Sequence, residues 1–160
     1  MLSTIGVYQV VLTIHILAVV VAFGVIFAYP MIDAQIRRAG PAALPGLHRL
    51  HLALARSVIT PAMTVVLLAG VYLVADGPYA MKDPWVGATF AILVVLFGLA
   101  GAVLIPTDKR LAELAERDLA AGGGAPSADY ERELRRAGAF GGLVVLLVVV
   151  AIFLMTAKPG

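Results

Sequence analysis

The sequence predicts an all-α fold, a four-helix transmembrane bundle, from its composition and from where its charges lie. Of 160 residues, 61% are hydrophobic and 14% are charged, and the mean hydropathy is +0.98. A soluble domain of this length could not bury so much apolar surface, so lipid must surround much of the chain. Asp, Glu, Lys and Arg are absent from residues 1–32, 57–75, 84–107 and 137–157.

Each charge-free run predicts one membrane span. A helix needs roughly 20 apolar residues to cross a hydrocarbon core of ~30 Å, and only a helix satisfies its own backbone at this length. The first run lacks a basic start and exceeds a signal-peptide core in length, so we expect it to be retained. The result is a single integral membrane domain over residues 1–160, with spans at about 5–30, 57–75, 85–106 and 137–157.

The basic residues predict the orientation. Ten of the twelve lie in the connections 31–56 and 107–136. The positive-inside rule therefore places both connections in the cytoplasm and both termini outside, in a multi-pass protein of a bacterial inner (plasma) membrane. Seven acidic residues accompany the six basic ones of the longer connection, so nucleic acid is not expected as a partner. The expected partner is the lipid bilayer. The absence of cysteine excludes disulfides and thiolate metal sites.

The first connection separates two helices. The stretch "AGPAALPG" at 39–46 has two prolines and two glycines and predicts a break after a helix ending near Gln35. The second helix is expected to start near Leu47, because apolar residues then recur every three or four positions. Pro61 lies a turn inside its span and removes the hydrogen bond to the Ser57 carbonyl, which predicts a kink. That bend either lets the helix follow its neighbours or opens a pocket.

The third helix is predicted to run to about Pro106 and to continue as a charged helix, until "GGGAPS" ends it. Ser127 or Asp129 then caps the fourth helix. We expect a cytoplasmic helical hairpin projecting roughly 20 Å. Gly138 and Gly142, four residues apart, are expected to mark close packing within the bundle rather than a dimer contact. The apolar residues expected to hold the two arms together are Leu111, Leu114, Ala115 and Leu119 on one arm and Tyr130, Leu134 and Ala137 on the other.

His15 is the leading candidate for chemistry, because it lies in mid-membrane within a run that has no charge. Its neutral imidazole is suited to ligate haem iron or another metal, or to hydrogen-bond a group on the next helix. Met155 is expected at the same depth as a second haem ligand, although methionine also fills gaps in cores. His48 and His51 share one helix face without evident further ligands, so we expect them to be solvated or to face lipid headgroups.

Three stretches, "TIHILAVVVAFGVIFAYP", "ITPAM" and "AKPG", resemble the HemJ-type protoporphyrinogen oxidases of haem synthesis. They are also similar to a related uncharacterised bacterial family of predicted integral membrane proteins and to the membrane part of CopD copper-resistance proteins. The resemblance matches His15 to the membrane histidine of the first helix, and Pro30 to the proline that closes it. HemJ proteins also carry a His-x-Lys element at the third helix, and "DPWVGATFAILVV" has neither residue, which argues against the oxidase activity.

Three functions follow from these observations and stay open. The first is a protein that binds haem b through His15, with a redox or haem-handling role. The second is a cofactor-free structural or accessory subunit of a homo-oligomer or of a larger membrane complex. The third, with less support, is copper-related or small-solute transport. The sequence does not decide whether the protein is an enzyme.

Overall fold

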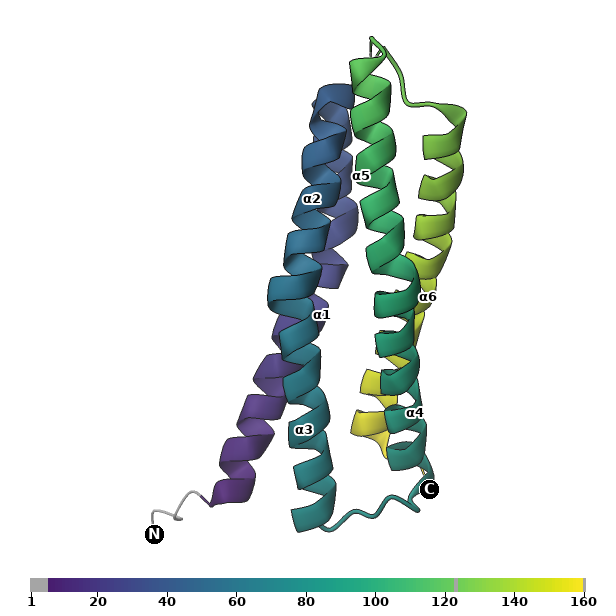
Figure 1. The fold of residues 1–160 in the computed structure, drawn as a ribbon. Helices are drawn as coiled ribbons and strands as arrows, with labels where there is room; N and C mark the ends of the chain where they lie inside the picture. Colours follow the sequence, from purple (N-terminus) through teal and green to yellow (C-terminus); the bar gives the residue numbers. More distant parts are fainter. Residues whose placement is uncertain (1–5, 123, 160) are drawn as a thin grey trace.

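The computed structural model describes residues 6–122 and 124–159 as an all-helical bundle (Figure 1). Four helical rods, Val7–Arg38, Pro41–Asp76, Pro84–Ala120 and Ala128–Ala157, are long and apolar enough to cross a membrane. Short turns of π-helix interrupt the second and third rods at Ala55–Ile59 and Ala100–Leu104. The α-helices are α1 (Val7–Arg38), α2 (Leu44–Leu54), α3 (Thr60–Asp76), α4 (Pro84–Leu99), α5 (Ile105–Ala120) and α6 (Ala128–Ala157), with a 3-10 turn at Pro41–Ala43.

The first helix ends later than the sequence suggested, and the second begins earlier. Helix α1 continues through Pro30 to Arg38, so Pro30 does not close it. The predicted break is reduced to Gly40, whose φ of 99° favours glycine, and the 3-10 turn after it. Pro45 lies at the start of α2, where a proline costs the helix no internal hydrogen bond. This is why α2 starts at Leu44 instead of near Leu47.

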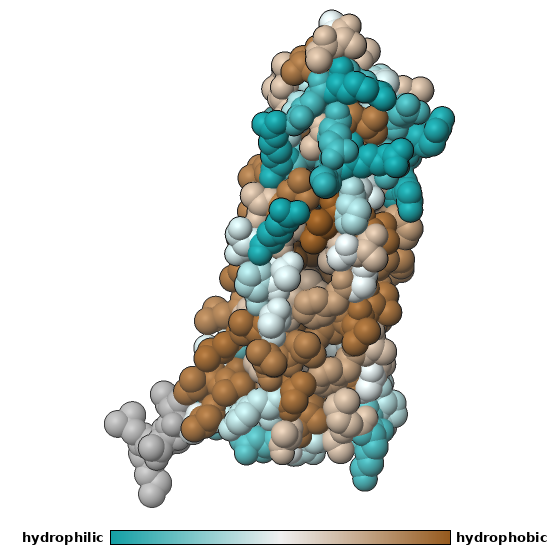
Figure 2. Space-filling model, viewed as in Figure 1, coloured by the Kyte–Doolittle hydropathy of each residue, from teal (hydrophilic) through white to brown (hydrophobic). Residues whose placement is uncertain are grey.

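The helices pack in pairs along the long axis. Helix α1 lies against α3, α4 lies against α6, and at the other end of the molecule α2 lies against α5 (Figure 1). The N-terminal end of α1 and the C-terminal end of α6 both lie at the lower end of the view. Figure 2 shows hydrophilic side chains concentrated at the opposite end, above a broad hydrophobic zone. We call the two ends the terminal end and the charged end.

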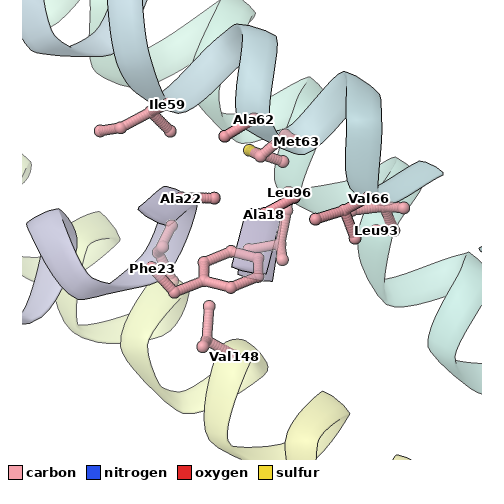
Figure 3. Close-up of a cluster of buried hydrophobic side chains, with 11 residues drawn as sticks. Ala18, Ala22, Phe23, Ile59, Ala62, Met63, Val66, Leu93, Leu96 and Val148 are labelled. Atoms are coloured by element: carbon pink, nitrogen blue, oxygen red, sulfur yellow. The ribbon is translucent and has the colours of Figure 1, made fainter. Parts of the chain in front are cut away.

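The core between the two ends is built from side chains of all four rods (Figure 3). Phe23 of α1 points toward Val148 of α6, and Met63 faces them from α3. The surface around this core is also apolar: Leu68 is 64% exposed and Phe153 is 62% exposed. Lipid is the solvent that suits such a surface, which agrees with four membrane-spanning helices.

Each π turn ends two residues before a proline, Pro61 in one rod and Pro106 in the other. Proline has no N–H, and its ring crowds the carbonyl four residues earlier; a wider turn relieves both conflicts. The Thr64 hydroxyl donates to the Thr60 carbonyl at 2.9 Å. Pro61 itself is exposed, while its neighbour Met63 fills the core. The surroundings of Pro61 therefore support the packing interpretation over the pocket.

A second, smaller core holds the charged end together. Ser127 caps α6 by accepting from the Tyr130 amide at 3.3 Å, as one of the two predicted caps. The arms α5 and α6 do not pack on each other alone, because Leu44 of α2 joins the same cluster. Leu119 was expected inside it, but is 43% exposed. The buried residues of this cluster are Leu44, Leu111, Ala115 and Tyr130, and the half-buried ones are Leu114, Leu134 and Ala137.

Within the described residues, Gly138 and Gly142 do not lie at a close contact between helices. Both are exposed, and a Cβ added at either would meet no atom within 4 Å. Helix α6 instead turns Val144 and Val148 into the bundle. Spacing alone cannot say which face of a uniformly apolar helix is turned inward, because every face of such a helix is compatible with lipid.

Candidate functional site

His15 is buried at 7% exposure, and its ring is held by the next helix. Its Nδ1 lies 3.1 Å from the backbone carbonyl oxygen of Val66 in α3. Because a carbonyl only accepts hydrogen bonds, Nδ1 must carry the proton and donate it. The second nitrogen, Nε2, therefore keeps its lone pair, the state in which a histidine ligates a metal. The hydrogen bond to a neighbouring helix, one of the two roles expected of His15, is present.

A cavity of about 360 Å³ adjoins His15 toward the terminal end. This volume falls within the range of small-molecule sites, which are mostly apolar with a few placed polar groups. Helices α1, α3, α4 and α6 all contribute to its wall. The residues that line it are Tyr8, Leu12, His15, Ile16, Val66, Gly70, Leu73, Val74, Tyr79, Trp85, Val86, Thr89, Phe90, Leu93, Met155, Thr156 and Lys158.

Gly70 leaves room beside the imidazole. A Cβ added there would stand 3.5 Å from Cε1 of His15 and 3.8 Å from Cζ of Phe90. A larger side chain at this position would therefore extend into the space next to the ring. The missing side chain of Gly70 is part of what keeps the cavity open at His15.

Met155 of α6 lines the same cavity as His15 of α1. The two residues lie 140 positions apart in the chain, and the sequence placed them at equal depth only by counting from the span boundaries. In the structure, both side chains line the same cavity. Pro61, Gly138 and Gly142 are not part of it.

The cavity has a cation and two aromatic rings at its rim. The Lys158 ammonium lies 4.4 Å from the centre of the Tyr79 ring and 5.9 Å from the Trp85 ring, and it donates to the Tyr79 hydroxyl. The two rings meet edge to face at 5.0 Å. Tyr79 lies in the connection between α3 and α4, and Trp85 lies in the first turn of α4. An apolar space with a cation at its mouth suits an apolar ligand that carries an acid group.

A second polar site lies at the charged end, and it corrects the expectation for His48 and His51. These histidines are neither solvated nor turned to lipid: they are 2% and 6% exposed. His48 Nδ1 lies 3.2 Å from Oδ1 of Asp108, and His48 Nε2 lies 2.9 Å from the Tyr130 hydroxyl. Oδ1 of Asp108 is also 3.5 Å from Nδ1 of His51. The side chains of α2, α5 and α6 thus meet in one polar cluster.

Helix α1 completes this cluster with Asp33 and Tyr29. Oδ1 of Asp33 lies 3.0 Å from His51 Nε2, yet the two atoms are not aligned for a hydrogen bond and both are buried without another partner. The Tyr29 ring stacks on His51 with ring centres 4.2 Å apart. This stacking fixes the plane of the His51 ring between two carboxylates.

His51 and Asp108 lie outside the four charge-free runs, and their charges shift each other's pKa values. Burial alone would lower the pKa of His51, but contacts with Asp108 and Asp33 outweigh it and raise that pKa to about 9. Burial would raise the pKa of Asp108, and the two histidines outweigh it and lower that pKa. The charged forms of His51 and Asp108 therefore stabilise each other in the fold.

A signal for this cluster is present in the sequence. Asp33 is the first charged residue after the first charge-free run, and Asp108 is the first after the third. Both runs end at the same face of the membrane in the predicted topology, so the two carboxylates share a depth. His48 and His51 lie three residues apart on one helix face. They come shortly before the second charge-free run, at the same face of the membrane in the predicted topology. What the sequence lacked was the order in which the helices pack.

The family model described as "Predicted integral membrane protein (DUF2269)" matches residues 9–159, nearly the whole chain. No curated protein and no solved structure matches the chain. The match covers the four helical rods except Val7 and Tyr8, and it includes His15 and the whole polar cluster at the charged end.

Proposed function

Because the chain belongs to this family of predicted integral membrane proteins, we propose a function performed inside the bilayer: binding of haem b through His15, for a redox or haem-handling role. The observation that carries the proposal is the hydrogen bond from His15 Nδ1 to the Val66 carbonyl, at 3.1 Å. Metal-ligating histidines usually donate their other ring N–H to such a partner, which fixes the tautomer and the ring direction. His15 already has this partner.

The lining of the cavity beside His15 supports a porphyrin as the ligand. Its wall is mostly apolar, as a macrocycle requires, and Gly70 leaves space at the edge of the imidazole. The Lys158 ammonium at the rim is suited to pair with a propionate. His15 would hold the iron through its free ring nitrogen, and Met155 is the candidate for a second ligand from the same wall. Iron held in this way supplies one-electron chemistry.

The orientation forms part of the proposal. Basic residues of α2, α5 and α6 mark the charged end, so the positive-inside rule directs that end to the cytoplasm. The cavity and both termini then face the outer side of an inner (plasma) membrane. A ligand would be taken up or released through the outer half of the bilayer.

The test is a reduced-minus-oxidised absorbance spectrum of the full chain, purified after expression with haem supplied. We expect a b-type spectrum that is lost in His15→Ala. Ile14→Ala is the matched control, since it truncates a neighbouring side chain of the same helix that is 46% exposed and does not line the cavity, so it should leave the spectrum intact. Met155→Leu is expected to keep the haem and change its spectrum if Met155 is the second ligand.

The other functions correspond to other outcomes of the same experiment. A folded, colourless wild-type protein would overturn haem binding and leave a structural or accessory subunit of a homo-oligomer or larger complex. A copper-related role would require copper, in place of haem, to copurify with the wild type and be lost in His15→Ala. A spectrum unchanged in His15→Ala would place the haem elsewhere in the chain.

A further inference from the structure

The cluster at the charged end has the geometry of a metal site. Oδ1 of Asp108 lies 3.2 Å from Nδ1 of His48 and 3.5 Å from Nδ1 of His51. In a tetrahedral site with bonds of roughly 2.0–2.1 Å, neighbouring ligand atoms are about 3.3 Å apart. One ligand atom from each of the three residues lies within 4.8 Å of the other two. The three groups are thus spaced as ligands of a common ion.

We infer that His48, His51 and Asp108 bind a divalent first-row transition-metal ion through two Nδ1 atoms and a carboxylate oxygen. This donor set, two imidazoles and one carboxylate, is typical of Zn²⁺ and of non-haem Fe²⁺. The chain has no cysteine, so the soft thiolate ligands that favour Cu⁺ are absent. The site goes beyond the proposed haem function, because it lies at the opposite end of the bundle from His15.

The surroundings of the two histidines support metal binding. Metal-bound histidines usually donate their other N–H to an oxygen. His48 has the Tyr130 hydroxyl 2.9 Å from its Nε2, and His51 has the Asp33 carboxylate 3.0 Å from its own. Both Nδ1 atoms are therefore directed at Asp108 while both Nε2 atoms face an oxygen. Among the described residues, His51 Nε2 has no aligned hydrogen bond. An ion bound to Nδ1 would leave the ring proton on Nε2, which faces Asp33.

The site is also reachable from water. The side chains of His48 and His51 are 3% and 8% exposed, whereas Asp108 is 20% exposed and Asp33 is 28% exposed. An ion would thus enter past the two carboxylates and meet the histidines below them. The remaining coordination position, on the side of Asp108, would be open to water or to a small ligand, as in catalytic rather than structural zinc sites.

The competing explanation is a proton in place of the metal. His48 and His51 would then be held to Asp108 and Asp33 by hydrogen bonds and ion pairs alone, which also satisfies buried charges. The two explanations differ in whether the folded chain takes up an ion. In both explanations, a single mutation breaks the same contacts. The test must therefore measure the bound ion directly.

The experiment uses the full chain in detergent, stripped with EDTA and titrated with Co²⁺, followed by Zn²⁺ competition. We expect one Co²⁺ per chain, with the strong visible absorption of four-coordinate cobalt, displaced by Zn²⁺. Asp108→Asn keeps the size and removes the anionic ligand, so the absorption should be lost. Glu116→Gln is the matched control, because it changes a half-exposed carboxylate at the same end of the bundle. Asp33→Asn should weaken binding by roughly 10–100-fold.

The wild-type result decides the inference even if Asp108→Asn does not fold. Absence of Co²⁺ absorption from folded wild-type protein, with no Zn²⁺ in elemental analysis after dialysis, would overturn it. Absorption that persists in folded Asp108→Asn would also overturn it, because the ion would then lie elsewhere. Retention of the cobalt spectrum in His15→Ala, together with loss of haem, would show that the two sites are separate.

Discussion

His48 and Asp108 meet with Nδ1 and Oδ1 3.2 Å apart, although 60 residues separate them in the chain. They lie on two different rods, His48 seven residues before the π turn of its rod and Asp108 four residues after the π turn of its own. Those turns set the rotation of α2 and α5 relative to α3 and α4, because a π turn contains more residues than an α turn. The polar cluster at the charged end therefore depends on both rods being interrupted at similar depths.

Tyr130→Phe tests the second oxygen partner of His48. Tyr130 is 1% exposed, and its hydroxyl is 2.9 Å from His48 Nε2. Removing that hydroxyl leaves a buried nitrogen without a partner, so we expect the free energy of unfolding to fall by about 1–3 kcal/mol. Denaturant unfolding in detergent with EDTA present measures it. Tyr72→Phe, which removes an exposed hydroxyl, is the control; equal losses in both variants would contradict the assignment.

Leu96→Ala tests the core that separates the two polar sites. Leu96 is 3% exposed within the main cluster, so its truncation leaves a cavity and should cost about 2 kcal/mol of unfolding free energy. Leu68→Ala makes the same chemical change at a residue that is 64% exposed, and should cost less than about 0.5 kcal/mol. Equal unfolding midpoints for the two variants would show that Leu96 is not buried as described.

Gly70→Leu tests whether the cavity beside His15 is the ligand site, without changing the histidine. A Cβ at this position already stands 3.5 Å from His15 Cε1, so a leucine side chain should occupy the adjoining space. We expect the haem absorbance per chain to fall at least several-fold. Gly24→Leu is the control, since a Cβ there meets no atom within 4 Å. Unchanged haem content in Gly70→Leu would move the proposed site away from this cavity.

The orientation is testable because the chain has no cysteine. Met81→Cys places a thiol in the exposed turn between α3 and α4, and Ala121→Cys places one at the end of α5. With the charged end in the cytoplasm, a membrane-impermeant maleimide should label Met81→Cys in intact cells. Ala121→Cys should be labelled only after lysis. The reverse pattern would invert the proposed topology.

The positions of the charged residues and the lengths of the runs between them were enough to predict the four helical rods from the sequence alone. Four charge-free runs predict four spanning helices, because unpaired charges are excluded from lipid and only a helix satisfies its own backbone there. The structure has four helices that meet those requirements. The burial of His15 against another helix was likewise foreseeable, because an imidazole in mid-membrane needs a partner.

The tertiary structure decided which faces of these helices point inward. The apolar helices have no polar face to mark the outside, so Gly138 and Gly142 were assigned to the core although they are exposed. His48 and His51 were assigned to solvent, although each is more than nine-tenths buried. In both cases the deciding fact was the neighbour supplied by another rod. Sequence spacing describes one helix at a time, whereas burial and ligation depend on groups from several helices at one point in space.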